Sequence, residues 1–474
     1  MKLSGKKILV VGLGKTGIST AVFLKKRGAD VIATDSSKDA NLFDAANNLS
    51  KIGINVELGV HNPSSFMNSE IIVLSPGVAH TIDPVANAAR CGAIIMGEIE
   101  LASRFIKEPI VAITGTNGKT TTTTLIGKML EESGLKVFVG GNIGNPLIDY
   151  IDSGNKADII VAEISSFQLD TIDVFRPKVS VLLNISEDHL DRYPDFNAYT
   201  KSKMKVFKNQ KENDYAVFNA SDKYIFPVAE DIKCSKLPFF NHTAANNYNE
   251  YAKITDDRIV FNLSKDFAVI NQEAADPVDV FEGNYSLPFS AINLLGKHNM
   301  ENVAAATLAS FAAGGNWTGI KSALKNFTGL AHRIEYITTI NEVKYYNDSK
   351  ATTVDSVIKA LEVFNTPVIL IMGGRDKGSN FGLLADTVKK HVKRLIAIGE
   401  AKEKIKSALG DKVDTILSDS LEDAIFSASR SAESDDVVLL SPACSSFDMF
   451  KSYAHRGEIF REEILKIAKT AGND

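Results

Sequence analysis

The sequence predicts an α/β protein of three successive domains, and three observations indicate this fold class. Its 474 residues are enough for several domains at about 100–200 residues each. Short apolar runs alternate with amphipathic stretches along most of the chain, which is the pattern of βαβ units. Two glycine-rich turns, at residues 12–17 and 114–121, each connect an apolar run to a helical pattern.

The composition is that of an ordinary globular chain, with 44% hydrophobic and 23% charged residues. Lys and Arg number 53 against 58 Asp and Glu, and the net charge of −5 argues against a surface that binds nucleic acid. No run approaches the roughly 18 apolar residues of a spanning helix. The three cysteines, Cys91, Cys234 and Cys444, form no CxxC pair. We therefore expect a cytoplasmic protein without a membrane span, a nucleic-acid partner or a zinc site.

The first hundred residues contain apolar runs that predict strands at residues 7–11, 31–34, 71–74 and 93–95. The first run leads into Gly12, Gly14 and Gly17 in the pattern GxGxxG, where missing side chains let a pyrophosphate approach a helix N-terminus. Asp35 ends the second run, 35 − 14 = 21 residues after Gly14, where a carboxylate can accept a ribose hydroxyl. This pattern is typical of an NAD site, but a UDP-sugar offers the same groups, so both ligands stay open.

The second glycine-rich turn, TGTNGKTT at residues 114–121, predicts a phosphate-binding loop. Consecutive amides can cradle phosphates, Lys119 can neutralise the β- and γ-phosphate oxygens, and the Thr120 hydroxyl can ligate Mg²⁺. The loop departs from GxxxxGK[ST] because Ile113 occupies the first glycine position. Glu163 follows the apolar run 159–162 and can hold the metal there, although a glutamate at a strand end is often only solvated.

The remaining runs complete the predicted organisation. Central strands are predicted at residues 109–114, 136–139, 157–162 and 178–183. Between residues 222 and 295 short runs such as 258–263 are typical of antiparallel strands, and residues 296–313 predict a helix. A third series has strands at 343–347, 367–372, 394–398 and 437–440. We predict a Rossmann-like N-terminal domain (1–101), a central P-loop ATPase-type parallel sheet (102–329) and a Rossmann-like C-terminal domain (330–474).

Two phosphate-type loops on separate α/β domains do not suit a simple dehydrogenase, which needs no ATP. The chain resembles the Mur ligase family over essentially its whole length. The resemblance rests on a set of motifs in family order: GLGKTG (12–17), SPGV (75–78), TGTNGKTTT (114–122), GNIG (141–144), EISSFQL (163–169), NISEDHLDRY (184–193), GKHNMEN (296–302), HR (332–333), NDSKATT (347–353), GGRDKG (373–378) and LSPACSSFD (440–448).

The resemblance implies an ATP-dependent, amide-forming ligase of peptidoglycan synthesis. In such a reaction a carboxylate receives the γ-phosphate of ATP, and an amine attacks the acyl phosphate and releases phosphate. EISSFQL together with the N-terminal glycine loop favours the members that add D-glutamate to UDP-N-acetylmuramoyl-L-alanine over those that add L-alanine, a diamino acid or a dipeptide. The resemblance also implies ATP and two Mg²⁺ ions, and we expect a monomer.

The resemblance assigns catalytic roles to Lys119, Glu163, His189 and Lys203. Thr120 and Glu163 would hold the first Mg²⁺, and His189 with a carbamylated Lys203 would hold the second. A carbamate would replace a cation with the oxygen donor that Mg²⁺ prefers. By residue type alone, His189 is more often a surface or loop histidine than a ligand, and Lys203 is more often part of a solvated basic helix face.

The same resemblance assigns the binding residues. ATP would contact Gly115, Thr116, Asn117, Gly118, Lys119, Thr120, Thr121, Asn302, Arg333 and Asp348. The UDP-substrate would contact Lys15, Thr16, Asp35, Ser36, Ser37, Ser75, Pro76, Gly77, Asn142, Gln168 and His189. D-Glutamate would contact Lys350, Thr352, Lys377, Ser446 and Tyr453. Ser36 and Ser37 stand where some relatives carry a basic residue, and Tyr453 replaces a phenylalanine.

Two other interpretations stay open. One is a nucleotide-binding regulator in which the first glycine loop holds NAD and the second acts as a switch. The other is a related ligase for a different amino acid, which would differ only in its C-terminal pocket.

Overall fold

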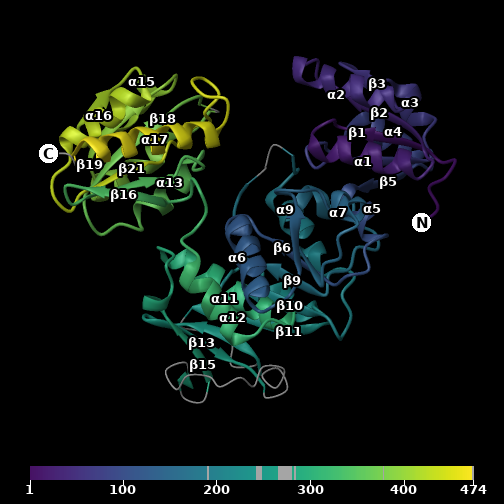
Figure 1. Ribbon diagram of the computed structural model, residues 1–474, viewed down its shortest axis with the longest axis horizontal. Helices are drawn as coiled ribbons and strands as arrows, with labels where there is room; N and C mark the ends of the chain where they lie inside the picture. Colours follow the sequence, from purple (N-terminus) through teal and green to yellow (C-terminus); the bar gives the residue numbers. More distant parts are fainter. Residues whose placement is uncertain (189–191, 242–247, 265–279, 282–283, 377, 472–474) are drawn as a thin grey trace. The chain divides into compact units, whose positions relative to one another are not determined.

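The computed structural model describes residues 1–188, 192–241, 248–264, 280–281, 284–376 and 378–471. The chain forms two compact units (Figure 1). The first unit contains residues 1–292 and 298–326, and the second contains residues 293–297 and 327–474. Three sheets lie within the segments predicted as domains, which confirms the three-part α/β fold class.

The N-terminal sheet has five parallel strands in the order β3-β2-β1-β4-β5. The strands are β1 (Lys7–Val11), β2 (Asp30–Asp35), β3 (Asn55–Leu58), β4 (Ile71–Leu74) and β5 (Ile94–Gly97). The helices are α1 (Lys15–Lys26), α2 (Ala40–Lys51), α3 (Pro63–Met67), α4 (Asp83–Arg90) and α5 (Glu98–Ser103). Apolar side chains of β1 alternate between two cores, with Ile8 and Val10 in one and Leu9 and Val11 in the other. The sheet is therefore buried on both faces, as the Rossmann-like prediction requires.

The central sheet has ten strands in the order β14-β15-β13-β12-β11-β10-β9-β6-β8-β7. Its strands are β6 (Ile110–Thr114), β7 (Val137–Gly141), β8 (Ile159–Glu163), β9 (Val179–Leu182), β10 (Tyr215–Asn219), β11 (Ser235–Asn241), β12 (Tyr251–Ile254), β13 (Arg258–Asn262), β14 (Val280–Phe281) and β15 (Asn284–Pro288). Strand pairing is parallel from β7 through β12 and antiparallel from β12 through β14. Antiparallel strands are predicted from about residue 222 onward. In the structure β11 and β12 still pair in parallel, and antiparallel pairing begins between β12 and β13.

Helices of the central segment connect or flank these strands. They are α6 (Lys119–Glu132), α7 (Leu147–Ser153), α8 (Ser166–Leu169), α9 (Phe196–Met204), α11 (Lys297–Ala312) and α12 (Trp317–Asn326). The 3₁₀ turns are η1 (Lys205–Phe207), η2 (Phe226–Asp231) and η5 (Phe289–Ala291). The predicted helix over 296–313 is confirmed as α11.

The C-terminal sheet has the order β16-β17-β21-β18-β19-β20, and only the β16–β17 pair is antiparallel. Its strands are β16 (Glu335–Ile340), β17 (Val343–Asn347), β18 (Val368–Gly373), β19 (Val392–Ile398), β20 (Thr415–Leu417) and β21 (Val437–Leu440). The helical elements are α13 (Val354–Leu361), η6 (Phe381–Leu384), α14 (Ala385–His391), α15 (Lys402–Leu409), α16 (Leu421–Ser431) and α17 (Tyr453–Ala471). One core joins the sheet to α13, η6, α14 and α15, and another joins it to α16 and α17.

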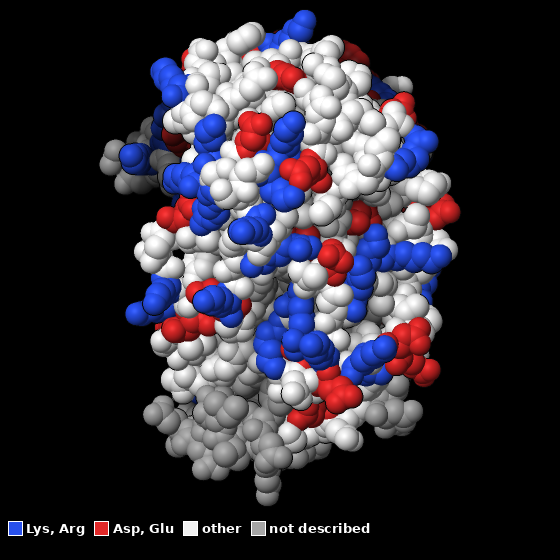
Figure 2. Space-filling model, turned by 90° about the vertical axis from the view of Figure 1, so that its right-hand side faces the viewer, with Lys and Arg blue, Asp and Glu red and all other residues white. Residues whose placement is uncertain are grey.

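Charge is distributed without large areas of one sign on the face shown in Figure 2, where basic and acidic side chains are intermingled. Among the described residues, no helix combines the length and apolar character needed to cross a membrane. Cys91 is an exposed free thiol, whereas Cys234 and Cys444 are buried free thiols.

Two buried acids of α5 connect the N-terminal sheet to the central one. Glu98 Oε1 accepts a 2.7 Å hydrogen bond from the Ile148 amide at the start of α7. Glu100 Oε2 accepts from three consecutive amides, those of residues 173–175, at 2.9–3.0 Å. Glu98 Oε2 has no hydrogen-bond partner among the described residues. Burial raises the pKa of the Glu98 carboxyl to about 7, although the Ile148 amide opposes this shift.

We predict that Glu98→Gln stabilises the protein at pH 8 but not near pH 5. The unfolded carboxyl, with a pKa near 4.5, releases its proton at lower pH than the folded one, so the free energy of unfolding falls as pH rises from about 4.5 to 7. Over this pH range the free energy of unfolding falls by about 3 kcal/mol. A neutral glutamine should recover most of this difference. Urea unfolding at both pH values measures the difference. The exposed control Glu212→Gln should show no such pH dependence, and an equal effect of Glu98→Gln at pH 5 and 8 would contradict the prediction.

Candidate active site

The central glycine loop lies between β6 and α6, as the sequence predicts. Gly115 and Gly118 have φ values of +152° and +82°, in the region that favours glycine. A Cβ at Gly118 would lie 2.2 Å from Asn302 Oδ1, so glycine is also required by the close approach of α11. The predicted adenine-contacting residue Asn302 is thus brought against the loop from more than 180 residues away in sequence, since 302 − 118 = 184.

The loop is held in place by the segment that follows β9. Asn184 Oδ1 accepts from the Asn117 amide at 2.8 Å, and its carbonyl accepts from the Thr116 amide at 2.9 Å. Thr116 Oγ1 accepts from the Ser186 amide at 3.0 Å and lies 3.0 Å from the Tyr199 hydroxyl. The loop backbone is therefore rigid before any ligand arrives.

Two lysines converge on one carbonyl of this loop. Lys119 Nζ donates to the carbonyls of Gly115 and Thr116 at 2.9 and 2.8 Å. Lys203 Nζ, from α9, donates to the same Gly115 carbonyl at 2.8 Å. Both amines thus lie at the loop that would receive the phosphates of ATP.

Lys203 is buried, with 2% of its surface exposed. Burial and the nearby Lys119 lower the pKa of the Lys203 amine well below its usual value, and Asp188 and Glu163 offset this only in part. The alternative interpretation, in which Lys203 is part of a solvated basic helix face, is therefore wrong. A lowered pKa favours the neutral, nucleophilic form of this amine.

Glu163 ends β8 and lies beside the start of the glycine loop, because it pairs with Ile113 of β6. Its side chain is 2% exposed, and its Oε1 accepts from Asn142 Nδ2 at 2.9 Å. Its Oε2 has no hydrogen-bond partner among the described residues. A buried carboxylate oxygen without a donor fits a cation, so Glu163, with the half-buried Thr120 of the first α6 turn, is a suitable Mg²⁺ site.

Predicted residues of the N-terminal loops also gather at the carboxyl ends of β1, β2 and β4. Asp35 accepts from the Leu13 amide at 2.7 Å and from the Ser37 amide at 2.8 Å, and Ser75 Oγ donates to the Gly12 carbonyl at 2.7 Å. Asp35 therefore shapes the glycine loop itself. Its expected bond to a ribose hydroxyl stays a prediction. Ser36, Pro76 and Gly77 lie on the same loops, and Thr16 lies in the first turn of α1.

Lys15 contacts the loop that follows β7, and Gln168 lies in α8 of the central segment. Lys15 Nζ donates to the Gly144 carbonyl and to Asn145 Oδ1 at 2.9 and 2.8 Å, so the predicted substrate lysine joins two predicted substrate loops. Gln168 Oε1 accepts from the Ser165 amide at 2.9 Å, while its buried Nε2 has no acceptor among the described residues. An unused buried donor suits an oxygen-rich ligand.

Asp348, a predicted ATP contact, is buried in the second unit with Arg333 nearby. Its Oδ2 accepts from Ser441 Oγ at 2.8 Å, and its Oδ1 accepts from the Ile334 amide. Burial raises the pKa of the Asp348 carboxyl to about 7, against these hydrogen bonds and the charge of Arg333.

The described D-glutamate candidates of the second unit lie after β17 (Lys350 and Thr352), after β21 (Ser446) and at the start of α17 (Tyr453). Lys350 Nζ lies 5.5 Å from the centre of the Tyr453 ring, and Ser349 Oγ donates to the Tyr453 carbonyl at 2.8 Å. Ser446 is buried and Thr352 is partly exposed. His189 and Lys377, which were also predicted to act in binding or catalysis, lie outside the described residues.

Arg456 is a site residue that the sequence analysis missed. It is fully buried, and its Nη2 donates to the carbonyls of Ser349 and Cys444 at 2.9 and 3.1 Å. Burial lowers the pKa of its guanidinium to about 10. Arg456 thus joins the loops that carry Lys350 and Ser446. The sequence could have indicated Arg456 by its position, because it precedes Phe460 and Ile464 at intervals of four residues and so lies on the buried face of α17.

Tyr199 was missed as well. It lies one helical turn before Lys203 on α9, with its ring centre 4.8 Å from Lys203 Nζ. Burial raises the pKa of its hydroxyl, which therefore remains protonated beside Thr116.

Comparisons with known proteins agree with this arrangement. Three family models match: the MurD-like N-terminal domain of Mur ligases over residues 6–97, the Mur ligase middle domain over 113–310, and the glutamate ligase domain of Mur ligases over 332–444. Two relatives are named UDP-N-acetylmuramoylalanine–D-glutamate ligase. The one from Desulfosudis oleivorans is 45% identical and the match covers 98% of both chains, and the one from Desulfatibacillum aliphaticivorans is 47% identical over 97% of this chain and 98% of its own.

Solved structures show the same fold at low identity. A pseudomurein peptide ligase type C from Methanothermus fervidus matches with a TM-score of 0.59 and 20% identity, over 98% of this chain and 100% of its own. The UDP-N-acetylmuramate–alanine ligase from Thermotoga maritima matches with a TM-score of 0.58 and 17% identity, over 97% and 99%. Since the three family models together span most of the sequence and the relatives align along nearly all of it, the chain belongs to the Mur ligase family.

Proposed function

We propose that this protein joins D-glutamate to UDP-N-acetylmuramoyl-L-alanine at the expense of ATP, in the synthesis of peptidoglycan precursors. The observation that carries the proposal is the convergence of Lys119, Lys203 and the unpartnered Glu163 oxygen on one rigid phosphate loop. The choice of D-glutamate is supported by the relatives of that printed name, which match the chain along almost its full length.

The reaction begins with a carboxylate, which is a poor acyl donor. Its oxygen attacks the γ-phosphorus of ATP, the bond to the bridging oxygen of ADP breaks, and an acyl phosphate forms. The amine of D-glutamate then attacks the carbonyl carbon, loses a proton and expels phosphate, so that an amide remains. Both steps bring anions together and therefore need fixed positive charge.

Lys119 supplies part of that charge at the loop. Gly115, Thr116, Asn117, Gly118 and Thr121 would contribute loop amides, and Asn302, Arg333 and Asp348 would contact the rest of the nucleotide. When bound, Mg²⁺ would neutralise phosphate charge and hold the reacting oxygens. We assign Thr120 and Glu163 to a first ion, and His189 with a carbamylated Lys203 to a second.

Carbamylation of Lys203 is supported by its burial and lowered pKa. A neutral amine nitrogen can attack the carbon of CO₂ and lose a proton, and the product is an N-carboxylate. The modification would turn a nitrogen donor beside Gly115 into an oxygen ligand for metal.

The substrates are assigned to the remaining groups. The loops 12–17, 35–37 and 75–77, with Asn142 and Gln168, would bind the UDP-sugar. Lys350, Thr352, Lys377, Ser446 and Tyr453 would bind the two carboxylates of D-glutamate through ammonium and hydroxyl donors. We further propose a cytoplasmic monomer with the domain boundaries 1–101, 102–329 and 330–474.

The function is tested by phosphate release from Mg-ATP with UDP-N-acetylmuramoyl-L-alanine and a panel of amino acids. We expect D-glutamate to stimulate release strongly, and L-alanine, L-lysine, meso-diaminopimelate and a D-alanyl dipeptide to leave it near background. Stimulation by another amino acid would identify a related ligase. A thermal shift with NAD and none with the UDP-substrate would instead support the regulator.

We predict that Lys119→Ala lowers kcat by about 10³-fold or more, because it removes fixed charge from the transferred phosphoryl group. The control Lys128→Ala, on the exposed side of the same helix, should retain activity. Steady-state phosphate release measures both, and a kcat of Lys119→Ala within tenfold of the parent protein would refute this role.

We predict that Lys203→Ala is inactive and is partly restored by formate or acetate, which can place a carboxylate oxygen where the carbamate would be. Lys119→Ala serves as the matched control, since it should gain nothing from the same acids. Turnover of Lys203→Ala that stays at background at every acid concentration would count against carbamylation.

A further inference from the structure

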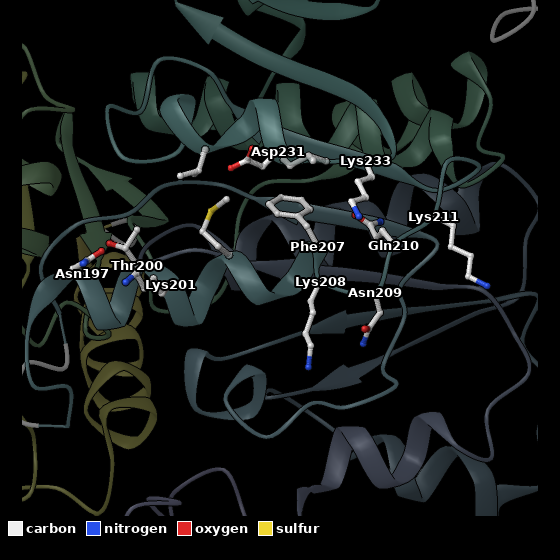
Figure 3. Close-up of a pocket in the computed structure, with 13 residues that line it drawn as sticks. Asn197, Thr200, Lys201, Phe207, Lys208, Asn209, Gln210, Lys211, Asp231 and Lys233 are labelled. Carbon is white, nitrogen blue, oxygen red and sulfur yellow. The ribbon is translucent and has the colours of Figure 1, made fainter.

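A cavity of about 630 Å³ lies between α9, η1 and the segment 228–233, in the first unit (Figure 3). None of its lining residues belongs to the sites assigned above. Its volume lies in the range of pockets that hold small organic molecules, about 300–1,000 Å³. The cavity is therefore a separate candidate site.

The floor of this cavity is apolar. Phe207 and Ile232 are 9% and 8% exposed, and Met204 and Val228 add partly buried surface. In Figure 3 the Phe207 ring lies near the centre of the lining. A hydrocarbon or aromatic body would gain free energy by covering this surface.

The rim carries four lysines and one carboxylate. Lys201, Lys208, Lys211 and Lys233 belong to the lining, where the amines of Lys208 and Lys211 point away from the Phe207 ring in Figure 3, and Asp231 is the acidic residue of the lining. Lys208 Nζ donates to the Ile172 carbonyl at 3.3 Å. Lys201, Lys211 and Lys233 have no ion pair or side-chain hydrogen bond within the described part of the chain. The rim therefore attracts an anion.

Three neutral side chains of the lining, those of Thr200, Asn209 and Gln210, already form hydrogen bonds within the fold. Gln210 Nε2 donates to the Tyr215 carbonyl at 3.0 Å, and Gln210 Oε1 accepts from Cys234 Sγ at 3.3 Å. Asn209 Nδ2 donates to the carbonyls of Asp173 and Phe175 at 2.7 and 2.9 Å. These bonds hold the wall in shape, which leaves the lysines as the main polar recognition groups.

The cavity shares α9 with Lys203 but uses a different face of the helix. Asn197, Thr200, Lys201 and Met204 follow the spacing i, i+3, i+4, i+7 and so form one stripe. Lys203 precedes Met204 by one residue, or about 100° around the helix, and reaches the Gly115 carbonyl. The cavity and the phosphate loop are thus distinct.

We propose that this cavity binds a small amphipathic anion, with an aromatic or aliphatic body on Phe207 and Ile232 and a phosphate, sulfonate or carboxylate among the lysines. A nucleic-acid backbone would use the lysines but not a recessed apolar floor. A lipid surface would be bound by lysines on a flat face of the protein, whereas these lysines line a cavity.

The proposal is tested with 8-anilinonaphthalene-1-sulfonate, whose fluorescence rises in apolar sites. With saturating Mg-ATP and UDP-N-acetylmuramoyl-L-alanine present, we expect saturable binding of one equivalent per chain. The double variant Lys201→Glu/Lys233→Glu should bind at least about tenfold more weakly, because two attractive charges become repulsive. The matched control Lys107→Glu/Lys156→Glu changes the net charge equally at exposed positions of the same unit and should bind as the parent protein does.

Four results would overturn the proposal. Equal affinity in the parent protein and both double variants would show that the probe lies elsewhere, as would complete displacement by the two substrates. Competition by sulfate as effective as that by 4-butylbenzenesulfonate would show that charge alone is recognised. Sedimentation with phosphatidylglycerol vesicles that is lost in Lys201→Glu/Lys233→Glu, while probe affinity is unchanged, would assign the lysines to a lipid surface. Circular dichroism confirms that each variant is folded.

Discussion

The active site depends on the placement of two amines at the carbonyl of Gly115. Lys119 and Lys203 both donate to this oxygen, at 2.9 and 2.8 Å, although they come from different helices. Two ammonium groups so close would repel each other, and burial resolves the conflict because it lowers the pKa of Lys203. Glu163 completes the arrangement with a buried oxygen that no described donor reaches. The same desolvation favours the neutral form of the Lys203 amine.

Rigidity around this centre comes from bonds that are remote in sequence. Asn184 and Ser186 fix the glycine loop, while Glu98, Glu100 and Lys15 connect the N-terminal sheet to the central one. In a ligase, the acyl carboxylate must meet the γ-phosphate in a reactive geometry, and small displacements are costly. The bonds of Glu98, Glu100 and Lys15 would limit such displacements between the N-terminal and central sheets.

In the second unit a buried cation, in place of the buried acids of α5, connects separate main-chain segments. Arg456 is buried and donates to main-chain carbonyls of two loops instead of pairing with a carboxylate, so the loops that carry Lys350 and Ser446 are held by one side chain. A guanidinium suits this task because its planar donors reach several acceptors at once. In the cavity beside α9, Asn209 and Gln210 form hydrogen bonds within the fold, while the lysines of the lining are exposed.

The α/β class, the three successive sheets and the central glycine loop could be predicted from the sequence, because glycine spacing and hydrophobic periodicity are local properties. The set of motifs also indicated the family. The three-dimensional arrangement was needed to find that Lys203 is buried, that Asp35 and Lys15 form hydrogen bonds with loop residues, and that β11 and β12 pair in parallel. It was also needed to place Tyr199 and Arg456 beside predicted site residues. Burial and hydrogen-bond partners arise from segments far apart in the chain, so no local pattern encodes them.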